Sequence, residues 1–374
     1  MLNYKKEQLE EYKKELGIVA SLSNLYSDNT APMIYYRATE NIYCRSFGAL
    51  NVSRSDCTAD AIFSAKIGVG IKTFLYQPLG GFQKIAEFNK QRPLFKDLSG
   101  IELIKKIAAL RNERIKTTVR TYGLQTMVYH CITRKQDGTI DIFEEPMKSI
   151  IVDKISILDT DDKKIVFTDG QEKYEFYYSK STLFKMFRAS SSILSFKVTI
   201  LDDPMESLSK LFDFLAETKS QTASKNQLPL PSLIVPLYSE NKKRGRFVPE
   251  KSGLNQWNAK GRVRKYNEVY IPFPKRLRKE NPNFFPPRKT KWELELPTSK
   301  KITMSVCQGS GKALMSKPNG ELGQWILRDV LNLAEGHLLS YNELLAKGID
   351  SVIFRKIDDL HFKCDFISNE TLDE

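Results

Sequence analysis

The stretch TADAIFSAKIGVGIKTF, residues 58–74, contains two short apolar runs separated by the triplet SAK. Runs of this length that are rich in isoleucine, valine and phenylalanine predict β-strands, and their close spacing predicts neighbouring strands. A single acid, Asp60, adjoins the first run, and a single lysine, Lys72, lies in the second. The stretch therefore predicts a pair of strands that carries an isolated carboxylate and an isolated ammonium group.

Helices and further strands surround this pair within residues 1–219. Apolar residues recur with helical spacing at 4–16, 100–115 and 203–219. Asp-Gly pairs lie between apolar runs at 137–138 and 169–170, and this arrangement predicts two antiparallel hairpins. We expect residues 1–219 to form one mixed α/β domain.

The composition changes at 220–239, where a polar segment is followed by three prolines. Because proline favours extended backbone, we expect a linker here. Residues 240–374 contain many short strand-like runs with proline and glycine between them, which predicts a mainly β barrel or pseudobarrel. The fold class expected for the whole chain is α+β, and two domains also suit its length of 374 residues.

Positive charge is concentrated in the second of these domains. The chain has a net charge of +13, and residues 242–317 alone contain 20 Lys and Arg against 5 Asp and Glu. A segment of this kind predicts a polyanionic partner such as DNA. The alternative is a solvated basic surface that only aids solubility.

The chain has no run of 18 apolar residues, and its start, MLNYKKEQLEEYKKEL, is a charged amphipathic segment. The five cysteines show no CxxC spacing. These features predict a cytoplasmic protein with reduced thiols and no membrane partner.

The second domain resembles a known family. SGLNQWNAKGRVRKYNEVYIPFP at 252–274 and CQGSGKALMSKPNGELGQW at 307–325 resemble the C-terminal DNA-recognition domain of restriction endonucleases of the NgoFVII and BfiI type. The resemblance extends over nearly all of 250–366. It implies a DNA-binding pseudobarrel of the plant B3 type, in which two arms grip the major groove of double-stranded DNA.

Two polar segments have the chemistry of such arms, because arginine suits guanine edges, asparagine and glutamine suit adenine edges, and glycine lets backbone amides approach phosphate. The residues expected in the first arm are Gln256, Trp257, Asn258, Lys260, Arg262, Arg264 and Lys265. Those expected in the second arm are Gln308, Ser310, Lys312, Ser316, Lys317 and Asn319. Trp257 is interpreted as a wedge or a buttress of its arm. Any one of these side chains is equally compatible with an ordinary exposed surface position.

NgoFVII-type enzymes usually join this domain to a phospholipase-D-like nuclease, whose signature is a histidine and a lysine two residues apart, followed by an aspartate. His361 and Lys363 have that interval, but they lie in the expected barrel and the rest of the motif is missing. We therefore expect a different catalytic module.

The stretch 58–74 is similar to the centre of a PD-(D/E)XK nuclease, with Asp60 on the first strand and Lys72 on the second. The usual second acid stands two residues before the lysine, and here that position is Gly70. Some restriction enzymes, including the NgoMIV type, place this acid on the following helix. Glu87, in a helix expected over GGFQKIAEFNK at 80–90, is the candidate.

This resemblance implies that Asp60 and Glu87 bind Mg²⁺ and that Lys72 positions the attacking water. Glu40, on another expected helix, would be an auxiliary acid, and Asp56 remains an alternative to Asp60. The competing interpretation is that Asp60 caps a turn while the lysine and Glu87 are solvated surface residues.

Taken together, the sequence predicts a type II restriction endonuclease of bacterial or archaeal origin. It would act as a homodimer or transient dimer on double-stranded DNA, and a cognate DNA methyltransferase would be its genomic neighbour. One alternative is a non-catalytic, sequence-specific DNA-binding regulator. Another is a restriction enzyme whose pseudobarrel reads an allosteric effector site, as in EcoRII.

Overall fold

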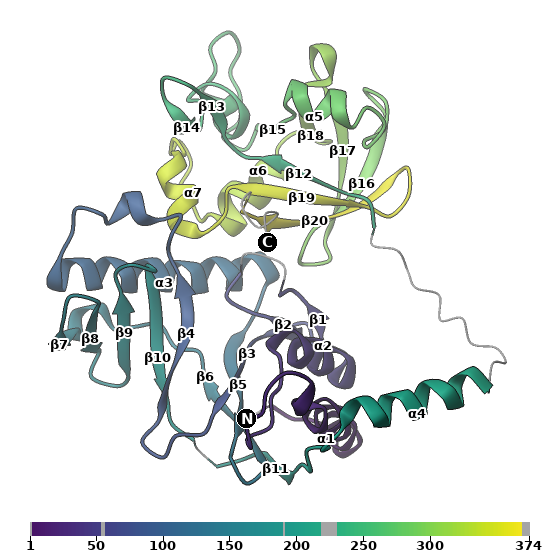
Figure 1. Cartoon of the computed structure of the whole chain (residues 1–374). Coiled ribbons are helices and arrows are strands. Elements are labelled where there is room, and N and C mark those ends of the chain that lie inside the picture. The colour runs from purple at the N-terminus through teal and green to yellow at the C-terminus, as the bar shows by residue number, and fades with distance from the viewer. Residues whose placement is uncertain (1, 54–56, 190, 218–229, 369–374) are drawn as a thin grey trace.

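Two β-sheets build the N-terminal half of the chain, and a third, seven-stranded sheet and a small two-stranded sheet build the C-terminal half (Figure 1). The computed structural model describes residues 2–53, 57–189, 191–217 and 230–368. The helices of the N-terminal half are α1 (Lys6–Ser21), α2 (Tyr36–Phe47), α3 (Gly100–Tyr122) and α4 (Pro204–Glu217). Helices and sheets occur together in this way, as expected for an α+β protein.

The first sheet contains the strand pair predicted from residues 58–74. Its order is β1 (Leu50–Asn51), β2 (Ala61–Phe63), β3 (Ile67–Leu75), β5 (Thr126–Arg134), β6 (Thr139–Pro146) and β11 (Leu194–Lys197). β2 is antiparallel to β3, whereas β3 is parallel to β5 and is joined to it by a crossover that includes β4 and α3. α1 and α2 pack on one face of this sheet, where Tyr12 and Ile42 share an apolar core with Val69 and Ile71.

The second sheet has the order β4 (Gly81–Glu87), β10 (Thr182–Phe187), β9 (Lys173–Tyr177), β8 (Lys164–Thr168) and β7 (Ser156–Thr160). Both predicted Asp-Gly hairpins are confirmed, as β5 with β6 and as β8 with β9. The helix predicted at 80–90 is wrong, because residues 81–87 form strand β4. Pairing with β10 satisfies the β4 backbone and buries Ala86, and this tertiary pairing outweighs the local helical pattern.

The third sheet curls into a nearly closed barrel. Its order is β12 (Ser232–Pro236), β19 (Ser351–Lys356), β20 (His361–Ile367), β16 (Lys291–Glu295), β17 (Lys301–Cys307), β18 (Ala313–Ser316) and β15 (Ile271–Pro272). The two edge strands, β12 and β15, approach each other. β12 lies within the segment expected to be a linker, so the barrel includes residues before 240, while 220–229 fall outside the described residues.

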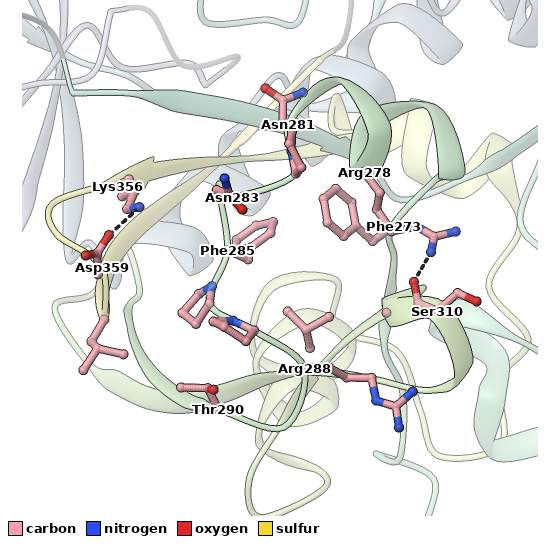
Figure 2. A pocket seen from close by; sticks show the side chains of 16 residues that line it. Phe273, Arg278, Asn281, Asn283, Phe285, Arg288, Thr290, Ser310, Lys356 and Asp359 are labelled. Atoms are coloured by element: carbon pink, nitrogen blue, oxygen red, sulfur yellow. Dashed lines mark hydrogen bonds and ion pairs between the residues drawn. The ribbon is translucent and has the colours of Figure 1, made fainter.

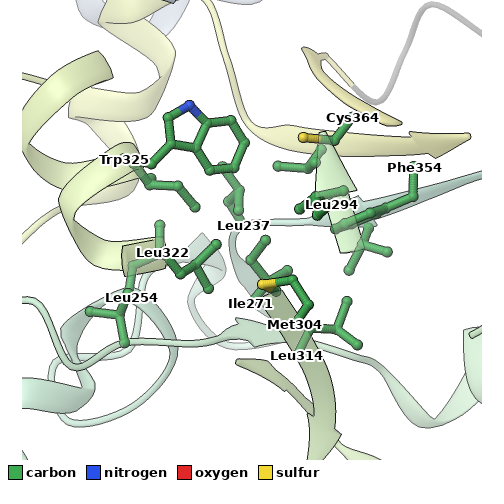
Figure 3. Close-up of a cluster of buried hydrophobic side chains, with 14 of the residues drawn as sticks. Leu237, Leu254, Ile271, Leu294, Met304, Leu314, Leu322, Trp325, Phe354 and Cys364 are labelled. Atoms are coloured by element: carbon green, nitrogen blue, oxygen red, sulfur yellow. The ribbon is translucent and has the colours of Figure 1, made fainter. Parts of the chain in front are cut away.

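Apolar side chains fill the barrel from all sides (Figure 3). Leu294, Met304 and Phe354 from three strands belong to the same core as Trp325, which lies in a π-helix over Gln324–Val330. The remaining elements of this half are β13 (Ser239–Asn241), β14 (Gly245–Phe247), α5 (Lys275–Glu280), α6 (Glu321–Gly323) and α7 (Tyr341–Lys347). The barrel therefore has a hydrophobic core of its own.

Helix α3 lies between the two halves of the molecule (Figure 1). Arg120 Nε donates a 2.7 Å hydrogen bond to the carbonyl of Val330, and Lys347 Nζ lies 2.7 Å from Glu113 Oε1. These contacts fix the barrel against the N-terminal domain. All five cysteines are free thiols, and no helix in the described ranges is long and apolar enough to cross a membrane.

Candidate active site and candidate nucleic-acid interface

Three of the predicted catalytic residues lie around one small cavity. Asp60, Lys72 and Glu87 line a space of about 200 Å³, together with Arg114 of α3 and Gly348 at the end of α7. Asp60 directly precedes β2, Lys72 lies in β3, and Glu87 is the last residue of β4. Strand pairing thus gathers residues that are separated along the chain.

The register of β2 and β3 explains how the acid and the lysine come to share a face. Ala61 lies opposite Val69, which places Asp60 opposite Gly70. The amide of Ile71 donates a 2.7 Å hydrogen bond to Asp60 Oδ2 and so orients the carboxylate. Because side chains alternate along a strand, Lys72 lies on the same face as Gly70.

The surroundings of residue 70 explain why it is a glycine, although the resembled nuclease motif has its second acid at this position. A Cβ atom at Gly70 would lie 2.7 Å from Met147 Cε and 3.3 Å from Tyr129 Cδ1. An acidic side chain would have to displace Met147 and would place its charge beside apolar groups, which is costly. Glu87 reaches the cavity from β4 instead of from this position.

Asp60 and Glu40 influence each other electrostatically. Burial raises the pKa of Asp60, and this effect is opposed by the positive charge of Lys72 and by the Ile71 amide. Glu40, on α2, is only 6% exposed, and burial together with the charge of Asp60 raises its pKa, although Arg37 lies 3.0 Å away. Glu40 does not line the cavity; it lies behind Asp60 as a neighbouring carboxylate.

Lys72 and Glu87 differ in how firmly they are held. Lys72 makes no hydrogen bond or ion pair with any described residue, and its side chain is half-buried. Glu87 is exposed, accepts a 2.5 Å hydrogen bond from Asn89 Nδ2 and lies 3.3 Å from Lys84 Nζ. The lysine is therefore available for a ligand, whereas the glutamate already has two partners at its surface.

The cavity contains two carboxylates that could take part in binding a metal ion. Within the described ranges, no cluster of three or more His, Cys, Asp or Glu side chains is placed to hold a metal ion. Magnesium commonly takes only one or two carboxylates and completes its shell with water and phosphate oxygens. Asp60 and Glu87 supply two such carboxylates, and a cation would relieve the cost of burying Asp60. Asp56, the alternative acid, lies outside the described residues.

The first predicted arm follows the 3₁₀ turn Gly253–Asn258. Lys260, Arg262 and Lys265 are exposed, and Arg262 is also ion-paired with Glu268. Two other members support the arm from within. Arg264 Nη1 donates a 2.8 Å hydrogen bond to the carbonyl of Ala259, and Asn258 Nδ2 donates one of 3.1 Å to that of Glu250.

Trp257 and Gln256 lie at the base of this arm. Trp257 packs partly on the barrel core and meets Tyr266 edge to face, with ring centroids 5.2 Å apart. These contacts favour the interpretation of Trp257 as a buttress of the arm over that of a wedge. Gln256 is only 9% exposed and lies in the 3₁₀ turn, and its contact with DNA stays a prediction.

The second predicted arm begins in the tight turn between β17 and β18 and continues through β18 to Asn319. Gln308 and Ser310 both adopt positive φ there, while Ser310, Lys312 and Lys317 are exposed. Ser316 is 1% exposed, and its hydroxyl accepts a 3.0 Å hydrogen bond from the Leu322 amide. Its side chain is thus engaged within the fold, and its contact with DNA stays a prediction.

The two arms are tied together by an acid that the sequence did not single out. Glu268 accepts hydrogen bonds from Arg262 of the first arm and, at 3.3 Å, from Asn319 Nδ2 of the second. These partners lower the pKa of Glu268, and the ion pair with Arg262 is the largest cause. Glu268 therefore links the two arms. In the sequence, the only indication of this role is that Glu268 is a single acid within a basic segment.

A basic recess lies beside the second arm. Its volume is about 540 Å³, and its lining contains four cationic side chains and no acid. The lining residues with charged or amide side chains are Arg288, Lys289, Lys291, Gln308 and Lys317. The first three belong to the basic segment PPRKTK, so this segment and the arm form one continuous positive surface.

A larger cavity of about 850 Å³ lies on the other side of this arm, next to α5 (Figure 2). Phe273 and Phe285 line it, and Arg278 donates a hydrogen bond to the carbonyl of Ser310 at its rim. That hydrogen bond ties the basic helix α5 to the tip of the second arm. The positions of the two basic elements are thereby coupled.

Comparison with known proteins agrees with this description of the barrel. Residues 235–358 match the model of the NgoFVII C-terminal B3-like DNA-binding domain. The match covers both arms and the strands β15 to β19, includes only the end of β12 and stops before β20, and it confirms the resemblance expected for the second domain. It identifies a DNA-binding domain of a type found in a restriction enzyme. A comparison with curated proteins finds none that matches the chain.

Proposed function

We propose that this protein is a type II restriction endonuclease that reads double-stranded DNA with its barrel and cleaves it with its N-terminal domain. The observation that carries the catalytic part is that Asp60, Lys72 and Glu87 line one cavity beside a DNA-binding domain. An acid, a lysine and a second acid around one space are the groups that metal-dependent phosphodiester hydrolysis requires.

In this proposal Asp60 and Glu87 bind Mg²⁺, and Glu40 adds negative charge behind Asp60. Bound there, the metal would polarise the scissile phosphate and make a bound water more acidic. The Ile71 amide keeps the Asp60 carboxylate in one orientation. Lys72, which has no competing partner among the described residues, holds the attacking water and stabilises the charge that develops as the new P–O bond forms and the ester P–O bond breaks.

The proposed DNA contacts come from the exposed parts of both arms. Lys260, Arg262 and Lys265 on one side, and Ser310, Lys312 and Lys317 on the other, present donors to phosphates and to base edges in the major groove. The basic recess beside the second arm contacts phosphate. Because many cations take part, binding weakens steeply as salt rises.

A duplex has two strands of opposite polarity, and each molecule has one such cavity in its described part. We therefore propose that a homodimer or a transient pair of molecules cuts both strands. A restriction enzyme of this kind would be produced in a bacterial or archaeal cytoplasm beside a cognate methyltransferase that protects host DNA.

Purified protein incubated with long unmethylated DNA and Mg²⁺ tests the proposal directly. Sequencing the fragment ends is expected to reveal one short motif at a constant distance from the cuts. Specific binding without cleavage in any divalent ion would instead favour a non-catalytic DNA-binding regulator. The lack of a metal-binding cluster of three side chains among the described residues is the observation that keeps this second function in view.

A further inference from the structure

Arg114 is a charged residue of the candidate cavity whose role no sequence motif indicates. It lies on α3 and lines the same space as Asp60, Lys72 and Glu87. Two cations and two carboxylates thus surround a space of about 200 Å³. The carboxylates suit a metal ion and the lysine suits a water molecule, so an arginine beside them needs a separate explanation.

The guanidinium of Arg114 is held in a fixed position. Its Nη2 donates a 2.8 Å hydrogen bond to Gln91 Oε1, and its Cζ lies 4.8 Å from the centroid of the Phe88 ring. Gln91 is itself only 2% exposed. A pre-positioned guanidinium is well suited to bind an oxyanion, because its planar fork matches the oxygens of a phosphate.

The groups that hold Arg114 are themselves fixed by the DNA-binding barrel. Gln91 Nε2 donates a 3.0 Å hydrogen bond to the carbonyl of Leu345 in α7. Gly348, which ends α7 with φ +76°, leaves room for the arginine, since a Cβ atom there would lie 3.1 Å from Arg114 Nε. The end of one barrel helix therefore determines where this guanidinium lies in the cavity.

We propose that Arg114 binds a non-bridging oxygen of the DNA phosphate in the cavity, and that the barrel sets its position through Gln91 and Gly348. This inference rests on the proposed nuclease function and adds a substrate-binding residue to it. It also provides a route by which the DNA-reading domain affects cleavage without touching the scissile bond.

The first experiment compares single-turnover cleavage by R114A, R114K and the wild type. Loss of one charge-stabilising donor is expected to slow R114A by roughly 10²-fold, with R114K in between. Arg120→Ala is the matched control, because Arg120 lies on the same helix and bonds the barrel at Val330 but does not line the cavity. DNA affinity without divalent ions should change far less than the cleavage rate in all three variants, since the arms supply most of it and R114A loses only one phosphate contact.

A phosphorothioate at the scissile position separates phosphate binding from a purely structural role. If Arg114 binds one non-bridging oxygen, the wild type cleaves the two phosphorothioate stereoisomers at different rates, and the ratio of these rates is smaller in R114A. Equal slowing of R114A and R120A with the distinction intact would overturn the inference and leave the nuclease function standing. A wild type that cuts no DNA would overturn both.

The second experiment tests the influence of the barrel. Gly348→Ala is expected to shift Arg114 and slow cleavage by roughly three- to tenfold, with DNA affinity unchanged. Gly245→Ala is its control: Gly245 also lies in the C-terminal half, at the start of β14, with positive φ, +61°, but an added Cβ would meet nothing within 4 Å. If both variants cleave equally well, the barrel does not position Arg114.

Discussion

The barrel and the N-terminal domain present their functional groups in opposite ways. In the barrel, most of the cationic side chains proposed to meet DNA are exposed, lie on two neighbouring arms and come from consecutive stretches of sequence. In the N-terminal domain, the candidate catalytic groups come from two sheets and a helix and surround a cavity of about 200 Å³. An extended basic surface tolerates small errors of placement, whereas a hydrolytic site does not.

The largest expected effect is a loss of cleavage without a loss of DNA binding. Replacing Lys72 with alanine should reduce cleavage by roughly 10²–10⁴-fold, because the group that holds the attacking water is removed. DNA affinity should not change, since the arms are intact. Parallel measurements of single-turnover cleavage and of binding without divalent ions check this prediction. Lys66→Ala, which changes an exposed lysine between β2 and β3 outside the cavity lining, is the control.

The converse experiment acts on the barrel. Lys312→Ala combined with Lys317→Ala should lower DNA affinity by about tenfold and reduce the slope of log affinity against log salt by about 0.9 for each phosphate that the arm no longer neutralises. Thermal stability should stay the same, because both side chains are exposed. Binding titrations over a range of salt concentrations measure the slope. An unchanged slope would mean that this arm does not touch phosphate.

Replacing Ser316, which lies in the same arm, should lower stability without lowering DNA affinity. Ser316→Ala removes the acceptor of the Leu322 amide and is expected to lower the free energy of unfolding by about 1–2 kcal/mol. Its effect on DNA affinity should be negligible, because the side chain is buried. Chemical denaturation measures the change in stability. A large fall in DNA affinity at unchanged stability would indicate instead that Ser316 contacts DNA.

The smallest expected effect concerns pH. Burial raises the pKa of Asp60 in the folded state, so folding takes up protons and stability falls as pH rises from the usual aspartate range through the raised value. Asp60→Asn removes this cost and should raise the melting temperature by about 1–3 °C near pH 8, with little change near pH 4. Added Ca²⁺ should stabilise the wild type and not the variant, which ties the carboxylate to a cation without measuring activity.

The sequence was informative wherever local chemistry decided the structure. The Asp-Gly hairpins formed as predicted, and the ordered motifs of the barrel indicated the family that residues 235–358 match. Glu87 was expected on a helix and lies on a strand, because the edge of β10 was invisible in the local pattern. Glu87 still lines the cavity, because the end of β4 lies there.

Other features depend on interactions between distant segments, and no local pattern reveals them. Gln91 and Gly348 hold Arg114 across the boundary between the two halves of the molecule. Glu268 links arms that are far apart in sequence. Gln256 and Ser316 have the composition of DNA-contacting residues, but the direction of their side chains is set by the turn and the barrel around them.

The position of α3 has a consequence for where the DNA would be cut. This helix has 23 residues, about 35 Å of length, and is bonded to the barrel through Arg120 and Glu113. Under the proposed function, this helix would hold the DNA-binding arms at a fixed distance from the candidate cavity. The number of base pairs between the recognised sequence and the cut would then be constant, because the two domains cannot change their separation.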